Sequence, residues 1–150
     1  MTTLTRSVSA SNDDAQETGG TMNLAASNLN ASSATQGIGL RFTNITIPPG
    51  STINSAYLTV NITSSSYDDP NLTIRGSGEA DTTTFTSTAN DITNRWKTSA
   101  SVSWSATGIG TGAKNSPDLA TLISEILAIP GWASGNDMNF YLQGNSGSAF

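Results

Sequence analysis

The chain lacks cysteine and histidine entirely, and only 17 of its 150 residues are charged, six of them basic and eleven acidic. Without thiol or imidazole groups it cannot build a Ser-His-Asp triad, a cysteine nucleophile, or the ordinary sites for zinc, copper, haem or iron–sulfur clusters. Six basic residues are too few for the clustered positive charge that nucleic acid requires. No window approaches the roughly 18 apolar residues that span a bilayer. The composition therefore predicts neither a nucleic-acid partner nor a membrane partner.

Small polar residues dominate instead, since Ser, Thr, Asn and Gly occupy 72 of the 150 positions. The hydrophobic content of 35% is low, but the net charge of −5 is modest, whereas disordered chains combine low hydrophobicity with high net charge. The length suits a single domain over residues 1–150. We therefore expect one folded domain with an uncharged surface, a composition typical of extracellular and virion-exposed β proteins.

The first residues carry no export signal, because Met1–Arg6 lacks both a charged n-region and an apolar h-region. The start therefore reads as native and unprocessed, while the surface composition is typical of the outside of the cell. One explanation reconciles the two. We expect the chain to leave the cell as part of a particle that is assembled in the cytoplasm and released by lysis.

Runs that alternate apolar and polar residues predict short β-strands along most of the chain. The clearest run spans residues 53–62. Another spans residues 37–47 and changes parity after Phe42, which predicts a bulge or bend near residues 43–44. Further strands are expected around Phe85, within a threonine tract, and at residues 4–8, 21–24, 72–76, 102–104 and 138–142.

Short strands separated by Gly, Pro, Asn and Asp turns indicate a mainly β fold, an antiparallel β-sandwich or jelly roll. Flexible loops are expected near residues 9–20, 26–37 and 106–115, with a tail over residues 144–150. The side chains that we expect to be structural are Phe42, Leu58, Val60, Trp104, Leu119, Ile123, Ile126 and Trp132.

One short α-helix is predicted at about residues 117–129. Ser116 is the expected N-cap and Pro117 the first helical residue. Pro130-Gly131 ends the helix, and Trp132 is expected to fold back over it. A second helical turn is expected at residues 91–95. The apolar stripe of the main helix consists of Leu119, Leu122, Ile123, Ile126 and Leu127.

Four motifs resemble a known family: residues 13–17, the run Ile38-Gly-Leu-Arg-Phe to Ser-Ala-Tyr-Leu58, Ser-Pro-Asp-Leu at 116–119, and Pro-Gly-Trp-Ala-Ser-Gly at 130–135. Together they resemble a β-sandwich domain, similar to carbohydrate-binding modules, of bacterial extracellular proteins and uncharacterised phage virion proteins. The resemblance covers almost the whole chain. It implies the sandwich fold and an extracellular or virion setting rather than an activity.

The sequence departs from that family near its end. Members continue past the strand that corresponds to residues 139–144 into a final strand, whereas this sequence stops at Phe150. A missing strand leaves an open sheet edge, and open edges are templates for pairing with another chain. We therefore expect a neighbouring subunit to cover or supply that edge.

Clustered acidic residues suggest one candidate metal site. Asp13, Asp14 and Glu17 crowd one loop, and Ca²⁺ prefers such oxygen ligands. The alternative is a solvated turn in which Asp caps its own backbone, or an ion pair of Asp13 or Asp14 with Arg41. The sequence requires no cofactor, and Ca²⁺ is the one metal ion that it suggests.

Three aromatic residues are candidates for contact with a glycan or a protein partner. Tyr57 opposes the apolar face of its strand, Tyr67 lies in a loop, and Trp96 stands between Arg95 and Lys97. Sugar rings stack on flat aromatic faces, and aromatic side chains also anchor protein interfaces. The alternative is packing at the edge of the fold.

These observations favour a non-enzymatic structural protein of a virion surface. We expect a capsid decoration (cement) protein or a head or neck fibre-type subunit of a tailed bacteriophage, which assembles with copies of itself and with other virion proteins. One alternative is a glycan- or receptor-binding module on a phage tail or a cell surface, with a host-surface glycan as its ligand. The other is a subunit of an extracellular filament.

Overall fold

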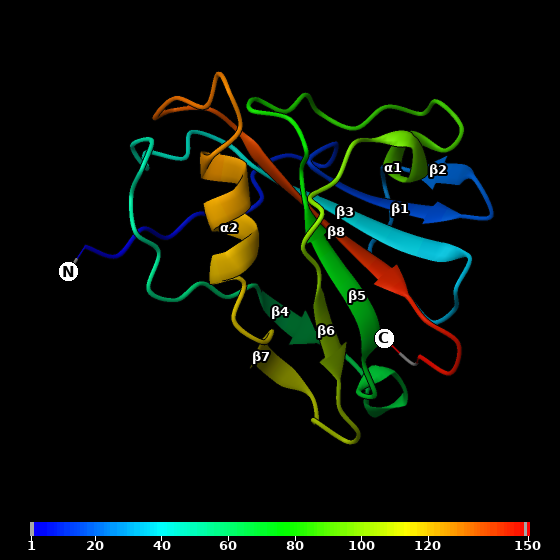
Figure 1. The fold of residues 1–150 in the computed structure, drawn as a ribbon. Helices are drawn as coiled ribbons and strands as arrows, with labels where there is room; N and C mark the ends of the chain where they lie inside the picture. Colours follow the sequence, from blue (N-terminus) through cyan, green and yellow to red (C-terminus); the bar gives the residue numbers. More distant parts are fainter. Residues whose placement is uncertain (1, 149) are drawn as a thin grey trace.

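The computed structural model describes residues 2–148 and 150. Its strands form two antiparallel sheets, one of six strands and one of two (Figure 1). The architecture is mainly antiparallel β, as the sequence predicts. The elements are β1 Asp14–Thr18, β2 Thr21–Asn23, β3 Gln36–Phe42, β4 Thr59–Ile62, the 3-10 turn η1 Ser65–Tyr67, β5 Asn71–Gly76, α1 Asp91–Asn94, β6 Val102–Ser105, β7 Gly112–Asn115, α2 Ala120–Leu127 and β8 Met138–Gly144.

Strand β8 lies in the middle of the larger sheet, whose order is β2-β1-β3-β8-β5-β6. Six of the seven residues of β8 are buried, so both of its faces are covered. Successive side chains of a strand point to opposite faces and therefore enter two different apolar clusters. Phe140 and Leu142 belong to the main core, whereas Tyr141 belongs to a smaller cluster on the other face.

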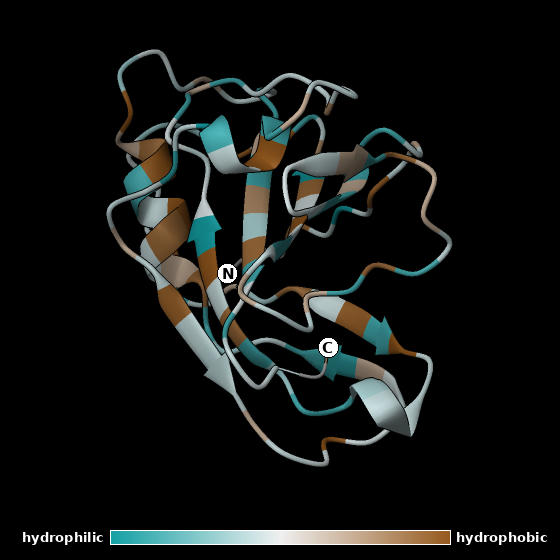
Figure 2. Ribbon diagram, turned by 90° about the vertical axis from the view of Figure 1, so that its right-hand side faces the viewer, coloured by the Kyte–Doolittle hydropathy of each residue, from teal (hydrophilic) through white to brown (hydrophobic). Residues whose placement is uncertain are grey.

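The main core lies between the larger sheet and a second layer, which contains α2, the β4–β7 sheet and irregular chain. In Figure 2 the strands carry alternating brown and pale bands, the pattern of strands with one apolar face. Trp132, which follows α2 in the sequence, is buried in this core, and its indole N–H donates to the Ile47 carbonyl at 3.0 Å. Leu58, Trp104, Leu119, Ile126 and Trp132 are buried in this core, and Phe42, Val60 and Ile123 pack against it partly buried.

The opposite face of the larger sheet is covered by residues 78–98, which we call the cover segment. Its helical turn α1, expected from the sequence, packs against β1 and β3. Phe85 and Ile92 of this segment complete the smaller cluster with Ala15 and Tyr141 of the sheet. The threonine tract around Phe85 was expected to form a strand, but it is irregular. Its role is to place one buried aromatic ring over the sheet.

Helix α2 is shorter than predicted and begins differently. Ser116 is not its N-cap, because the Ser116 hydroxyl instead accepts a hydrogen bond from the Leu58 backbone N–H at 3.1 Å. Asp118 accepts from the Ala120 N–H at 2.9 Å at the start of the helix. Gly76 of β5 allows close approach, since a Cβ there would lie 2.6 Å from Ile126. No helix of the described residues is long and apolar enough to cross a membrane.

Several strand boundaries differ from the prediction. The bend after β3 is present and centres on Asn44, whose φ is 55°. Of the run 53–62, only β4 forms a ladder, and residues 4–8 form none. Two strands lie where loops were expected, β1 within residues 9–20 and β7 within residues 106–115.

Strand β8 is not an open edge, because it pairs with β3 on one side and β5 on the other. The residues that follow are also packed: Phe150 is buried against Trp104, and its carbonyl accepts from the Ala31 N–H at 2.6 Å. The edges of the larger sheet are β2 and β6, and the smaller sheet has only β4 and β7. The finer assignment to a sandwich or a jelly roll stays a prediction.

Gly39→Ala should destabilise the fold, because the added methyl group would overlap the Phe85 ring. Overpacking of this kind costs about 1–3 kcal/mol in the free energy of unfolding, which urea denaturation measures. Gly37→Ala is the matched control on the same strand and face, where the added carbon meets the flexible end of Gln143 at 3.3 Å. Equal losses in the two variants would contradict a tight fit between Gly39 and Phe85.

Candidate functional site

The three acidic residues predicted as a cation site do not converge. Asp13 pairs with the Arg41 guanidinium at 2.7 Å, and Glu17 accepts hydrogen bonds from the backbone N–H and the hydroxyl of Thr93. Asp14 faces the opposite side of β1. The described part of the chain holds no group of three His, Cys, Asp or Glu side chains placed to bind a metal ion. The geometry therefore matches the alternative, an ion pair of Asp13 with Arg41.

The Arg41 guanidinium holds three segments together. It pairs with the carboxylates of Asp13 and Asp137, and its Nε donates to the Thr82 carbonyl at 3.2 Å. Asp137 also accepts from the Asn44 backbone N–H at 2.8 Å, at the residue with positive φ. These contacts fix the bend after β3, so the charge of Arg41 has a structural use.

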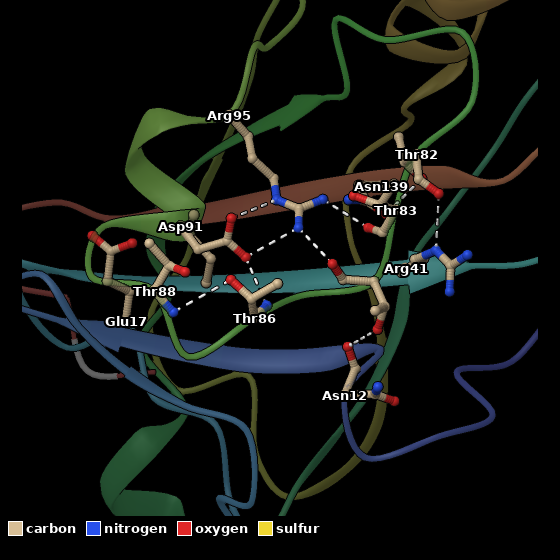
Figure 3. Close-up of polar contacts among 12 residues, drawn as sticks. Asn12, Glu17, Arg41, Thr82, Thr83, Thr86, Thr88, Asp91, Arg95 and Asn139 are labelled. Atoms are coloured by element: carbon tan, nitrogen blue, oxygen red, sulfur yellow. Dashed lines mark hydrogen bonds and ion pairs between the residues drawn. The ribbon is translucent and has the colours of Figure 1, made fainter.

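Arg95 plays the same part within the cover segment (Figure 3). It pairs with Asp91 at 3.0 Å and donates to the carbonyls of Thr83 and Thr84 at 2.7 and 2.6 Å. Its guanidinium carbon lies 4.6 Å from the centre of the Phe85 ring, within the range of a cation–π interaction. Arg95 therefore ties α1 to the tract that carries Phe85.

Lys97 lies near the C-terminal end of the cover segment and binds backbone carbonyls within it. Its Nζ donates to the carbonyls of Ile92, Thr93 and Arg95 at 2.7 to 3.0 Å, and it lies 4.8 Å from the centre of the Tyr141 ring. Burial lowers the pKa of Lys97 and raises the pKa of the Tyr141 hydroxyl. Because three backbone carbonyls accept hydrogen bonds from the Lys97 ammonium, we infer that Lys97 stabilises the fold rather than binding a ligand.

Buried polar groups under the cover segment satisfy one another. The Thr82 hydroxyl donates to the side-chain oxygen of Asn139 at 2.9 Å, and the Asn139 amide donates to the Tyr141 hydroxyl at 3.3 Å. Within residues 2–148 and 150, no buried side-chain nitrogen or oxygen lacks a partner. A buried polar group without a partner can indicate a ligand site, and this network contains none. Its hydrogen bonds instead connect the cover segment to the face of the larger sheet beneath it.

The three aromatic residues predicted to contact a partner all lie at the surface. Tyr57 is 53% exposed, Tyr67 44% and Trp96 76%. Trp96 stands next to an isolated bridge between Ser77 and Lys97, and its carbonyl accepts from the Gly78 N–H at 2.9 Å. The backbone of Trp96 is therefore fixed while its indole ring lies largely in water.

A cleft of about 560 Å³, which we call the β4 cleft, opens beside β4. Its floor is the inner face of the larger sheet, with Ile38, Leu40 and Leu142. One wall is residues 60–64 and the other is residues 26–30. Other lining side chains are Asp14, Tyr67 and Phe150. Of the three predicted contact residues, the structure places only Tyr67 at this cleft.

Comparison of the chain with protein-family models, with curated proteins and with solved structures finds no match. The functional assignment therefore rests on the chemistry of the surface described above.

Sequence reasoning missed the β4 cleft because its walls come from separate segments. Residues 26–30 were expected to be part of a flexible loop, and residues 60–62 were expected to lie within a longer strand. One signal was available: residues 57–66 contain neither a charge nor a proline, the usual protections of an exposed strand edge.

The neighbours Asp13 and Asp14 should respond to neutralisation in opposite directions. Asp13→Asn removes the ion pair with Arg41 beneath the cover segment and should cost about 1–3 kcal/mol at pH 7. Burial raises the pKa of Asp14 above its ordinary value, and the charge of Asp13 adds to the effect. Ionising Asp14 therefore costs stability: the contribution of Asp14 to the free energy of unfolding is greatest below pH 3.8 and is lost as the pH rises through its folded-state pKa.

At a dilution where the chain is monomeric, Asp14→Asn should accordingly raise the Tm at pH 7 and leave it nearly unchanged at pH 3, where Asp14 is protonated in both states. Calorimetry of wild type, Asp13→Asn and Asp14→Asn at the two pH values makes the comparison. A lower Tm for Asp14→Asn at pH 7 would show that the Asp14 carboxylate is stabilising, contrary to this prediction.

Proposed function

We propose that this chain is a non-enzymatic structural subunit of a virion surface, a capsid decoration protein or a head or neck fibre-type subunit of a tailed bacteriophage. It acts by docking on copies of itself and on other virion proteins. The single observation that carries the proposal is the exposure of Tyr57, Tyr67 and Trp96 on a chain with few charges. Exposed aromatic side chains are the usual anchors of protein interfaces.

The use of charge supports the same proposal. Arg41, Arg95 and Lys97, half of the six basic residues, are engaged in contacts that hold the fold together. A surface made mainly of Ser, Thr, Asn and Gly packs against identical copies without repulsion between like charges. The four sequence motifs that resemble a β-sandwich family imply the same extracellular or virion setting, although no family model matches the chain.

The purified chain should form closed or open multimers at micromolar concentration, measured by light scattering coupled to size-exclusion chromatography. Trp96→Ser should weaken association and leave the Tm of the dissociated subunit unchanged, because the indole ring is largely solvated in the single subunit. Thr121→Ala, at an exposed position of α2, is the matched control and should change neither quantity. A monomer at every concentration tested would contradict the proposed function.

A second candidate is a glycan- or receptor-binding module, and the fixed backbone of Trp96 favours it. A flat aromatic ring on a rigid support binds a sugar ring with little loss of conformational entropy. Affinity electrophoresis in gels that contain host polysaccharides tests this candidate. Retardation that is lost in Trp96→Ala and kept in Tyr57→Ala would favour glycan binding over assembly, and absence of retardation would count against it.

A further inference from the structure

The outer edge of β4 is unpaired. The Ser116 N–H donates to the Leu58 carbonyl at 2.8 Å, so Leu58 and Ser116 form a hydrogen-bonded pair. In the register of the β4–β7 ladder, the backbone groups of Val60 and Ile62 therefore also point toward β7. Because bonded pairs alternate along an antiparallel ladder, the backbone groups of Asn61 and Thr63 point away from β7. Within residues 2–148 and 150, no hydrogen bond joins these outward groups to another segment.

This edge borders the β4 cleft, whose lining includes residues 60–64. The β4 cleft has an apolar floor and is bounded by β4 on one side and by residues 26–30 on the other. An extended segment that enters the cleft would lie between β4 and residues 26–30. Asp14 is the one charged side chain among the residues that line the cleft.

The chain also contains an extended segment without a ladder. Residues 2–9 take part in no backbone–backbone hydrogen bond within the described structure. Leu4, Arg6 and Val8 are partly buried, whereas the residues between them are exposed, so the segment has the two-residue period of a strand. Arg6 holds it in place through the Asn44 carbonyl and the Thr46 hydroxyl.

We propose that residues 2–9 of a second copy of this chain enter the β4 cleft and add a strand to the outer edge of β4. The inference rests on the proposed function of assembly and names the surfaces that perform it. Backbone groups of Asn61 and Thr63 pair with the incoming strand. Leu4 and Val8 cover the apolar floor, and Arg6, on the same face of the strand, meets Asp14.

Charge and pattern select this occupant. The segment carries one positive charge, and the charged lining residue of the cleft is negative, so the two surfaces are complementary. Leu4, Arg6 and Val8 share one face of the segment, and two of these three residues are apolar, which suits a strand over an apolar floor with one acidic lining residue. Within the single subunit its backbone lacks strand partners, so moving it to a neighbour breaks no ladder.

The two surfaces occupy different places on one subunit. Figure 1 shows the N-terminus on the side of α2, whereas the C-terminus lies on the other side of the larger sheet's strands β5 and β6 from it. An interface between two different patches is heterologous, and such interfaces form rings when the rotation closes and filaments when it does not. The expected assemblies are therefore rings or filaments.

Intermolecular disulfide formation tests the contact directly, since the chain has no native cysteine. Thr5→Cys and Thr63→Cys are made in separate preparations of different tag size, mixed and oxidised. Both positions lie on the solvent-facing side of the proposed strand pair, so the mixed disulfide should form. Thr5→Cys mixed with Thr21→Cys, on the exposed edge strand β2, is the matched control and should couple about tenfold more slowly.

Asn61→Pro tests whether the outer edge of β4 receives the incoming strand. It removes an N–H that points away from β7, where proline is tolerated, and should lower the association constant about tenfold. Asn61→Thr keeps the N–H and should associate like wild type. The Tm of both variants shows whether the subunit is folded. Should Asn61→Pro fail to fold, the disulfide experiment still decides.

The outcomes separate this inference from the proposed function. Multimers that persist in Asn61→Pro, together with equal disulfide rates at Thr63 and Thr21, would overturn strand addition and leave assembly standing. A monomer in every experiment would overturn both. An oligosaccharide that shifts the amide resonances of residues 60–64, with no competition from a peptide of residues 2–9, would replace the strand by a sugar as the occupant.

Discussion

The burial of β8 on both faces is the constraint on which the rest of the structure depends. A strand covered on one side needs one apolar layer, whereas β8 needs two, and its residues alternate between them. The second layer, with α2, supplies the first cover, and residues 78–98 supply the other. Positions 39 and 76 are occupied by glycine, and a larger residue at either would contact Phe85 or Ile126 of these covering layers too closely.

The cover segment, residues 78–98, explains why half of the basic side chains lie within the fold. A segment with little regular structure cannot satisfy its own backbone, so Arg41, Arg95 and Lys97 donate to its carbonyls or to those of its neighbours. Basic side chains that hold the fold together in this way contribute little to the surface. What remains outside is mainly polar and carries few charges, with Tyr57, Tyr67 and Trp96 as the large exposed hydrophobic residues. Such a surface suits docking on other chains.

Patterns that need only local information could be predicted from the sequence. The two-residue period located β3, β5, β6 and β8, and the change of parity located the bend at Asn44. Strand β1 could not be predicted because its buried residues, Ala15 and Glu17, and Asp13 directly before it do not form a hydrophobic run. The partners of Asp13 and Glu17, Arg41 and Thr93, are 28 and 76 residues away. The β4 cleft was missed for the same reason, since its walls are distant in sequence.

Amide hydrogen exchange at β4, compared between dilute and associated samples, tests strand addition most directly. The Val60 and Ile62 amides are bonded to β7 and should be protected at both concentrations. If a neighbouring strand pairs with the outer edge, the Asn61 and Thr63 amides become protected only in the associated sample. Fast exchange at Asn61 and Thr63 in a fully associated sample would contradict strand addition at β4.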